Sequence, residues 1–296
     1  MNDRYQNLQG DLRNNESLAK HTSWRVGGYA QHFYRPTNVQ DLAKFLSQLP
    51  EAEPILWLGL GSNLLVRDGG FAGTVISTAG TLQQLDIQKE TVKAEVGVYC
   101  GKLAKQVAKA GLTGAAFLAG IPGTLGGALA MNAGAHQAEI WQFVSDVTTI
   151  DCNGTLRTRT PEDFNISYRH VEAPADEWFV AATLNFTEGN AEKELEQIKT
   201  LLKRRNDTQP ANQPCAGSVF RNPENDFAGR LVEAIDLKGL TVGGASVSEK
   251  HANFIVNNGT ATAADIEALI LLVQQKVESA HGIKLIPEVH VVGEHA

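Results

Sequence analysis

The chain has 296 residues, more than one ordinary domain holds, which predicts two or three domains. Hydrophobic residues make up 43% of the sequence and charged residues 20%, so packed cores are expected and a large disordered part is not. The formal net charge of −7 excludes an overall basic surface for nucleic acid, so a phosphate-bearing ligand would need a local site.

The cysteine pattern and the first residues predict a cytoplasmic protein. The cysteines, Cys100, Cys152 and Cys215, are widely spaced, which is typical of reduced thiols. Residues 1–20 are polar, lack the apolar core of a secretory signal, and are expected to form a short leader segment. No run approaches the ~18 apolar residues of a membrane span, so no membrane insertion is expected. The histidines and cysteines form no ligand pattern, which predicts no metal.

Hydrophobic periodicity, capping residues and turn residues predict strands and helices along the whole chain. Asn38 is expected to cap the first helix, and Asn153 with Gly154 to form a hairpin turn. The strands are predicted over residues 31–36, 55–58, 74–77, 92–98, 143–151, 155–159, 178–186, 254–257 and 287–292. The helices are predicted over residues 39–49, 101–110, 191–205, 228–237 and 262–282.

The most unusual stretch covers residues 119–136, which consist almost entirely of glycine, alanine and small polar residues. Glycine has no Cβ, so such a run lets backbone approach a ligand closely. Pro122 fixes one turn, and Gly123 and Thr124 are expected to expose backbone N–H groups beside a hydroxyl, an arrangement that suits phosphate. The alternative is a tight turn between core elements, because a glycine-rich loop is a weak motif by itself.

A second small-residue loop covers residues 59–66, directly after the strand predicted at 55–58. It lacks a full GxGxxG motif and no helix pattern follows it, which disfavours a Rossmann fold. Together the two loops could grip an extended ligand that carries a diphosphate, such as a dinucleotide in a different type of domain.

Three polar residues, Arg169, Ser218 and Glu288, stand in apolar surroundings. An arginine can hold a carboxylate through two hydrogen bonds, a serine beside a cation can donate a proton, and a glutamate can relay one. Spacing alone favours ordinary roles for them, as a surface cation, a turn hydroxyl and a solvated strand residue.

Six motifs occur in a familiar order and cover the chain from about residue 21 to residue 292. They are Arg25-Val26-Gly27-Gly28, Gly59-Leu60-Gly61-Ser62-Asn63, Ile121-Pro122-Gly123-Thr124-Leu125-Gly126-Gly127, Tyr168-Arg169, Gly217-Ser218-Val219-Phe220-Arg221-Asn222-Pro223 and Pro287-Glu288-Val289. Taken together, these motifs closely resemble the UDP-N-acetylenolpyruvoylglucosamine reductase (MurB) family of peptidoglycan precursor synthesis.

The resemblance implies an α+β protein with a two-subdomain FAD-binding fold of the vanillyl-alcohol-oxidase (PCMH) type and a C-terminal α+β substrate-binding domain. We expect the FAD-binding subdomains over residues 1–72 and 73–207. The substrate-binding domain is expected over residues 208–296, after a Pro- and Asn-rich passage at 206–214. The strand near 285–292 is expected to return to the FAD region.

The resemblance also implies the roles of particular residues. Arg169, Ser218 and Glu288 match the catalytic positions. Tyr168, Asn222, Lys250 and His251 match substrate-contacting positions, the last two more loosely, so that a solvated charge stays an equal alternative there. The matches to FAD-binding positions are Gly59, Gly61, Ser62, Asn63, Leu64, Ile121, Pro122, Gly123, Thr124, Gly126, Gly127, Asn132 and Gly134.

The reaction implied by the resemblance is NADPH-dependent reduction of UDP-N-acetylglucosamine enolpyruvate to UDP-N-acetylmuramate by way of non-covalent FAD. Hydride reaches C3 of the enolpyruvyl group, Arg169 and Glu288 stabilise the enolate, and Ser218 protonates C2. The expected partners are the UDP-sugar and NADPH, with no nucleic acid, and the protein is expected to be a monomer.

One departure concerns the short Pro-containing loop between Arg169 and Trp178. The longer form of the family has an insertion there with a substrate-covering tyrosine, so this chain resembles the shorter, type II form and that tyrosine is not carried over.

Two other functions stay open at this point. One is a flavin oxidase acting on an alcohol or hydroxy acid, although neither loop shows a histidine motif for covalent flavin attachment. The other is a non-catalytic nucleotide-binding module, which would be colourless even with FAD supplied.

Overall fold

The computed structural model describes residues 5–296, and the chain divides into two compact units. The first unit comprises residues up to Asn14, His32–Leu60 and Gly73–Lys203, and the second comprises Asn15–Gln31, Gly61–Ala72 and Arg204–Ala296. The loop at 59–66 is therefore divided between the units, because Gly59 belongs to the first and Gly61 to the second.

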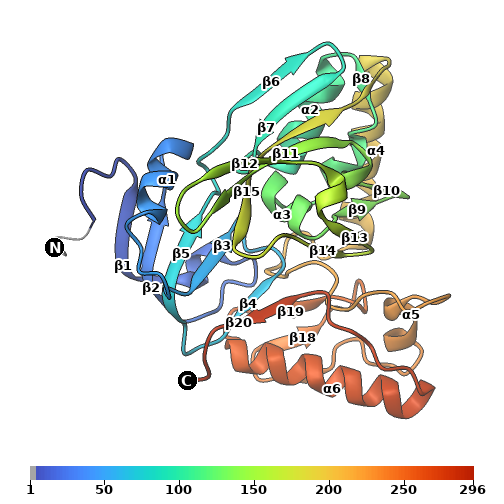
Figure 1. The fold of residues 1–296 in the computed structure, drawn as a ribbon. Coiled ribbons are helices and arrows are strands. Elements are labelled where there is room, and N and C mark those ends of the chain that lie inside the picture. Colours follow the sequence, from blue (N-terminus) through green and yellow to red (C-terminus); the bar gives the residue numbers. More distant parts are fainter. Residues whose placement is uncertain (1–4) are drawn as a thin grey trace. The chain divides into compact units, whose positions relative to one another are not determined.

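Six α-helices, four short 3₁₀ helices and twenty strands make up the described part of the chain (Figure 1). The α-helices are α1 (Val39–Leu46), α2 (Cys100–Lys109), α3 (Leu125–Ala130), α4 (Ala191–Thr208), α5 (Ala228–Glu233) and α6 (Ala263–His281). The 3₁₀ helices are η1 (Leu18–His21), η2 (Ala116–Gly120), η3 (Ile140–Gln142) and η4 (Pro161–Asp163). The strands are β1 (Asp11–Ser17), β2 (Tyr29–Arg35), β3 (Ile55–Leu58), β4 (Leu64–Val66), β5 (Phe71–Ser77), β6 (Leu85–Gln88), β7 (Thr91–Glu95), β8 (Leu112–Thr113), β9 (Gly134–Ala135), β10 (Ala138–Glu139), β11 (Val144–Asp151), β12 (Leu156–Arg159), β13 (Asn165–Ser167), β14 (His170–Glu172), β15 (Glu177–Asn185), β16 (Thr187–Glu188), β17 (Thr241–Val242), β18 (Ala245–Val247), β19 (Ile255–Asn257) and β20 (His290–Val292).

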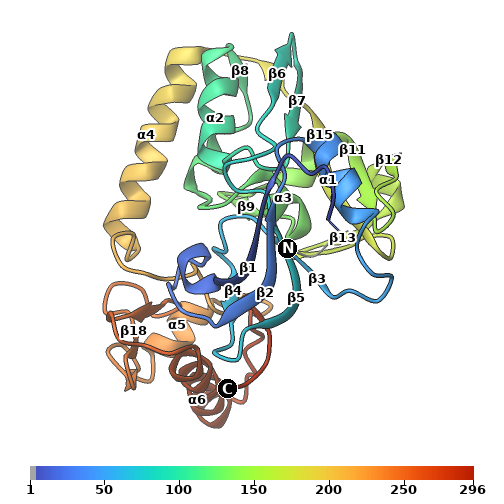
Figure 2. The same ribbon diagram turned by 90° about the vertical axis from the view of Figure 1, so that its left-hand side faces the viewer.

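The first unit is built on an antiparallel sheet in the order β12-β11-β15-β7-β6. Alternate residues of β15, Val180, Ala182 and Leu184, are buried, as expected for a strand with one face in the core. Figures 1 and 2 show α2 and α4 on the same side of this sheet. The apolar face of α2, which includes Leu103 and Val107, belongs to the same core.

A second sheet has the order β1-β2-β5-β3, and β3 pairs with β5 in parallel. Beside it, the ring of Tyr34 stacks on Phe45 of α1, and its hydroxyl donates to the buried Asp41 carboxylate at 2.7 Å. Burial alone would raise the pKa of Asp41, but the hydrogen bonds it accepts from Gln9, Thr37 and Tyr34 lower it below its ordinary value. This carboxylate therefore fixes α1 to the residues that precede β1.

The second unit packs α6 against the sheet β17-β18-β19 (Figure 1). Thr262 and Asp265 form a capping box at the start of α6, and Gly282 ends it with φ +69°. The fully buried Trp24 donates to the carbonyl of Ile255 at 2.8 Å, which attaches the early segment of the unit to β19. The last strand, β20, pairs in parallel with β4.

Most predicted elements are confirmed within a few residues, but the structure corrects several. The expected leader contains strand β1, because pairing in a sheet overrides its polar composition. The glycine-rich stretch contains the unpredicted helix α3, where buried Leu125 and Leu129 outweigh the poor helix propensity of glycine. The ends also move: α1 and α5 stop earlier than predicted, the strand predicted at 92–98 stops at Glu95, and α4 continues to Thr208.

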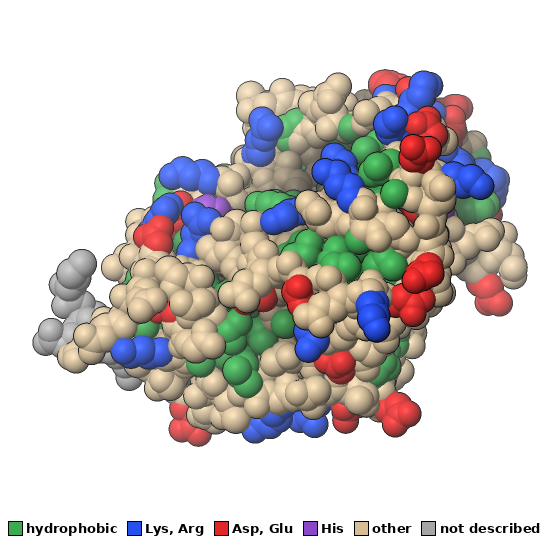
Figure 3. All heavy atoms as spheres, turned by 90° about the horizontal axis from the view of Figure 1, so that it is seen from above, with side chains coloured by type: hydrophobic (Ala, Val, Ile, Leu, Met, Phe, Trp, Pro, Cys, Tyr) green, Lys and Arg blue, Asp and Glu red, His purple; other side chains and the backbone are tan. Residues whose placement is uncertain are grey.

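Within residues 5–296, no helix is long and apolar enough to cross a membrane, and no cluster of metal-ligating side chains occurs. Figure 3 shows that Lys and Arg side chains share the face seen from above with Asp, Glu and hydrophobic side chains.

Candidate functional site

The turn around Pro122 uses much of its backbone internally. The Gly123 N–H donates to the carbonyl of Ile121 at 2.9 Å, and the Gly123 carbonyl accepts from the N–H of Cys100 at 2.9 Å. The expectation that Gly123 exposes its N–H is therefore wrong, because that group closes a three-residue turn around Pro122. Thr124 follows in extended conformation as the N-cap of α3.

Gly59 and Thr124 face each other within the first unit. A Cβ atom on Gly59 would lie 2.6 Å from Thr124 Oγ1, closer than real contacts allow. The Thr124 hydroxyl is buried, with no hydrogen-bond partner among the residues that the structure describes. A buried polar group without a partner is rare in folded proteins, so it marks a place where a ligand group fits.

Asn132 shows the same feature at the other end of the stretch. Its Nδ2 donates to the Glu139 carboxylate at 2.7 Å and to the Ser167 carbonyl at 3.1 Å. Its Oδ1 is buried and has no partner in the described part of the chain. Asn132 also has φ +41°, a conformation that few non-glycine residues adopt.

The other glycines of the stretch differ in how much space a side chain would have at each position. A Cβ on Gly126 would lie 3.0 Å from Val96 Cβ, and one on Gly134 would lie 2.6 Å from the carbonyl oxygen of Ala138. Packing against neighbouring protein atoms explains these two glycines. Gly127 is exposed, and the nearest atom to its added Cβ is Thr124 Oγ1 at 4.0 Å, so it borders the open side of the stretch.

Arg169 lies at the turn of the β13–β14 hairpin with φ +54°. Its guanidinium donates to the Gly134 carbonyl at 2.7 Å and to the Asn132 carbonyl at 3.4 Å. It also lies 5.0 Å from the ring centre of Tyr168, which is 46% exposed. The structure thus joins the predicted catalytic arginine to the predicted FAD-binding stretch.

Ser218 and Glu288 lie on adjacent segments of the second unit. The Glu288 N–H donates to the Val219 carbonyl at 2.7 Å, and Phe220 and Pro287 form a β-bridge. Asn63 belongs to the same arrangement, because its Nδ2 donates to the Glu288 carbonyl at 3.0 Å.

The rest of the loop after Gly59 leads into this arrangement. Gly61 has φ +60°, and its carbonyl accepts from Ser23. Ser62 is partly buried, and Leu64 begins β4, where it pairs with His290.

The predicted substrate-contacting residues of the second unit have protein partners. Asn222 Oδ1 accepts from the N–H of Ala228 at 3.1 Å, and the exposed Lys250 amine donates to the carbonyl of Asn206 in the last turn of α4. His251 Nδ1 faces the N–H of Asn253 at 3.2 Å, and burial and the charge of Lys238 lower its pKa. These contacts do not test whether Asn222, Lys250 and His251 bind the substrate, so their substrate roles stay predictions.

Sequence reasoning gave no functional role to three residues of the second unit, Asn253, Arg205 and Arg221, although Arg221 lies in the motif that contains Ser218. Asn253 is buried and hydrogen-bonds the Val219–Phe220 segment. Arg205 and Arg221 each bury an Nε atom for which the described residues supply no acceptor. Burial and hydrogen bonding distinguish these residues, because their types and spacing in the sequence do not.

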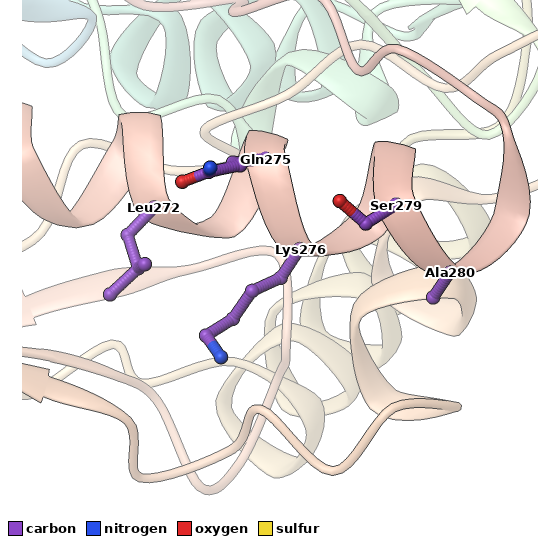
Figure 4. A pocket seen from close by; sticks show the side chains of 5 residues that line it. All are labelled: Leu272, Gln275, Lys276, Ser279 and Ala280. Carbon is purple, nitrogen blue, oxygen red and sulfur yellow. The ribbon is translucent and has the colours of Figure 1, made fainter.

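A separate depression lies along α6 and contains none of the predicted site residues. Figure 4 shows the side chains that line it: Leu272, Gln275, Lys276, Ser279 and Ala280.

Comparisons with known proteins connect these observations. Residues 209–292 match the C-terminal domain of UDP-N-acetylenolpyruvoylglucosamine reductase, and residues 30–159 match an FAD binding domain. UDP-N-acetylenolpyruvoylglucosamine reductase from Alkalilimnicola ehrlichii is 57% identical over 285 residues, covering 96% of each chain. The protein of the same name from Legionella pneumophila (strain Lens) is 56% identical over 288 residues, covering 97% of this chain and 94% of its own.

A solved structure agrees. The crystal structure of UDP-N-acetylenolpyruvylglucosamine reductase (MurB) from Thermus caldophilus matches with a TM-score of 0.83 and 32% identity, over 96% of this chain and 99% of that one. These matches confirm the predicted fold class, an α+β FAD-binding fold followed by a C-terminal domain. This chain therefore belongs to the UDP-N-acetylenolpyruvoylglucosamine reductase family, whose members are FAD-dependent oxidoreductases.

Proposed function

We propose that this protein uses NADPH and non-covalently bound FAD to reduce the enolpyruvyl group of UDP-N-acetylglucosamine enolpyruvate, giving UDP-N-acetylmuramate for peptidoglycan synthesis. The relatives of the same name support the substrate. The observation that carries the proposal is the 2.7 Å hydrogen bond from the Glu288 N–H to the Val219 carbonyl, which pairs the segments that contain Glu288 and Ser218. A monomeric cytoplasmic enzyme remains part of the prediction.

The residues of the first unit fit a bound FAD. Thr124 Oγ1 and Asn132 Oδ1 are buried polar atoms that need partners, and the absence of a Cβ at Gly59 keeps the space beside Thr124 open. We infer that these groups, with the backbone of Gly127, contact the cofactor, and that Gly61–Leu64 supply its remaining contacts. FAD, when bound, supplies the hydride-transfer chemistry, and the protein supplies binding and orientation.

The reacting end of the substrate carries a carboxylate, and negative charge develops beside it during reduction. We assign Arg169 to this charge, because a guanidinium can bind a carboxylate through two parallel hydrogen bonds. Its existing hydrogen bonds to the carbonyls of Asn132 and Gly134 hold the side chain in a fixed direction.

We assign Ser218 as the donor of the proton that completes the reaction. Its Oγ–H would protonate C2 of the enolate, and the oxygen would then recover a proton from solvent or a neighbouring group. Glu288, in its protonated form or sharing a proton, would stabilise the enolate beside it.

The diphosphate of the substrate needs positive charge, although the chain as a whole is acidic. Arg205 and Arg221 lie on either side of Ser218 in the sequence, and each has a buried Nε–H for which no described residue provides an acceptor. We infer that these two guanidinium groups bind the diphosphate, since a buried N–H donor without an acceptor is unfavourable and a guanidinium suits phosphate.

An absorbance spectrum of the purified protein, followed under anaerobic conditions, tests the proposal. We expect flavin bands that bleach with NADPH and return when UDP-N-acetylglucosamine enolpyruvate is added. A protein that stays colourless after reconstitution with FAD would instead be a non-catalytic module. Bleaching by alcohols or hydroxy acids, with no response to the enolpyruvyl substrate, would identify an oxidase.

A further inference from the structure

We propose that Asn253 is a positioning residue that holds Ser218 in place for proton transfer, an inference that rests on the proposed function. Asn253 is 4% exposed and lies two residues before β19. Both polar atoms of its side chain bind the backbone of Phe220. Its effect must therefore pass through the backbone segment that follows Ser218.

The side-chain amide of Asn253 binds that segment through both its oxygen and its nitrogen. Asn253 Oδ1 accepts from the N–H of Phe220 at 3.0 Å, and Nδ2 donates to the Phe220 carbonyl at 2.9 Å. The Asn253 backbone carbonyl also accepts from the N–H of Val219 at 2.8 Å. Three hydrogen bonds from one residue thus fix the two residues directly after Ser218.

The opposite edge of the same segment binds the chain around Glu288, which precedes β20. The Val219 carbonyl accepts from Glu288 at 2.7 Å, and the Arg221 N–H donates to the Ile286 carbonyl at 2.9 Å. The segment therefore lies between Asn253 and Glu288, and a shift of the segment changes the position of Ser218 relative to Glu288.

The residue before Ser218 offers no comparable support. Gly217 has φ +74°, and a Cβ added to it would have no atom within 4 Å among the residues that the structure describes. The space into which a Cβ of Gly217 would project is thus open, although the preceding Ala216 is buried. The three hydrogen bonds from Asn253 are the nearest firm attachment on the other side.

Asn253 is itself held by a short turn. Its N–H donates to His251 Nδ1 at 3.2 Å, and the His251 carbonyl accepts from Phe254 at 3.0 Å. Burial and the charge of Lys238 lower the pKa of His251, against the opposing charge of Glu233, which favours the neutral ring that can accept this hydrogen bond.

Proton transfer requires the donor to lie within about 2.6–3.2 Å of its target, and an error of about 1 Å can cost about 100-fold in rate. Asn253→Ala removes both side-chain hydrogen bonds to Phe220. We therefore expect re-oxidation of the NADPH-reduced enzyme by the enolpyruvyl substrate to slow by about 10- to 100-fold. Reduction by NADPH, FAD content and substrate KM should stay near wild type.

Asn258→Ala is the matched control. Asn258 is exposed, and its side-chain amide hydrogen-bonds only Ser246 among the described residues. Hydrogen exchange of peptides that contain Phe220 and Glu288, measured without FAD, gives a readout independent of activity. Exchange should be faster in Asn253→Ala and unchanged in Asn258→Ala. Asn253→Ser serves the same comparison if Asn253→Ala does not fold.

A double mutant separates positioning from general weakening of the fold. If Asn253 acts through Ser218, adding Asn253→Ala to Ser218→Ala should change the substrate step by at most about 2-fold, because the group it positions is gone. The proposal would be overturned if Asn253→Ala slowed the substrate step equally in the wild-type and Ser218→Ala backgrounds. It would also be overturned if Asn253→Ala slowed the NADPH step as much as the substrate step, or left both rates at the wild-type value. A wild-type enzyme that ignores the enolpyruvyl substrate would overturn the proposed function, and this inference with it.

Discussion

In the glycine-rich stretch, Thr124 Oγ1 and Asn132 Oδ1 are buried without partners among residues 5–296, whereas around Ser218 the buried amide of Asn253 has partners on both its oxygen and its nitrogen. The two regions also differ in composition. The first relies on small residues such as Gly59, which leave space, and the second on polar side chains that bind backbone.

This difference separates binding from positioning. A ligand-binding surface keeps polar groups available, because the ligand supplies the missing partners. A segment that carries a reacting group is fixed by the protein itself, because its position has to be correct before the substrate arrives. Substitutions in the first region should therefore change cofactor affinity, and substitutions in the second should change the substrate step.

The largest effect is expected for Ser218→Ala. This variant should bind FAD and accept hydride from NADPH normally, while turnover of the enolpyruvyl substrate falls by roughly 10²- to 10⁴-fold, because the proton donor is lost. Anaerobic stopped-flow absorbance measures the two half-reactions separately. Ser279→Ala, an exposed position on α6, is the control. Unchanged turnover in Ser218→Ala would remove this serine from the mechanism.

Arg169→Ala should follow, with substrate reduction slowed by roughly 10²- to 10³-fold through loss of charge stabilisation. The same change also removes the hydrogen bonds to the Asn132 and Gly134 carbonyls, so a modest loss of FAD affinity is expected too. Arg169→Lys keeps the charge but not the two-pronged geometry and should recover only part of the rate. If the NADPH step and the substrate step fell equally, Arg169 would belong to the cofactor site alone.

The sequence predicted the elements whose signals are local. Thr262, Asp265 and Gly282 mark both ends of α6 by capping, and Asn153 with Gly154 marks the hairpin between β11 and β12. Helix α3 could not be predicted this way, because its stability comes from burying Leu125 and Leu129 in a core formed by distant residues.

The site shows the same limit. Family motifs pointed to Ser218 and Glu288, but the hydrogen bond that joins their segments pairs residues about seventy positions apart in the sequence. Asn253 had no signal at all, because one asparagine in an apolar run acquires its role only when the fold places Phe220 beside it. Likewise, the use of the Gly123 N–H within its own turn depends on backbone geometry that composition does not specify.

Gly59→Ala tests the open character of the first region. The added methyl would lie 2.6 Å from Thr124 Oγ1, so the hydroxyl must move and the space beside it closes. We expect FAD affinity to fall by about 10- to 100-fold, in line with the cost of about 1–3 kcal/mol for overpacking. Gly120→Ala is the matched control, because a Cβ there has no described atom within 4 Å. Equal FAD affinities in the two variants, measured by flavin fluorescence titration, would contradict this account of Gly59.

The smallest and most specific effect is expected for Thr124→Val, which replaces the buried hydroxyl by a methyl group of similar size. Without FAD, the unfolding free energy should stay unchanged or rise by up to about 1 kcal/mol, because a buried hydroxyl without a partner is unfavourable. With FAD, the variant should lose one hydrogen bond of about 1 kcal/mol and bind about 5-fold more weakly. Thermal unfolding with and without FAD measures both terms. A Thr124→Val protein that is more stable without FAD but binds FAD more weakly would establish that this hydroxyl serves cofactor binding. Destabilisation of the FAD-free protein would show instead that the hydroxyl serves the fold.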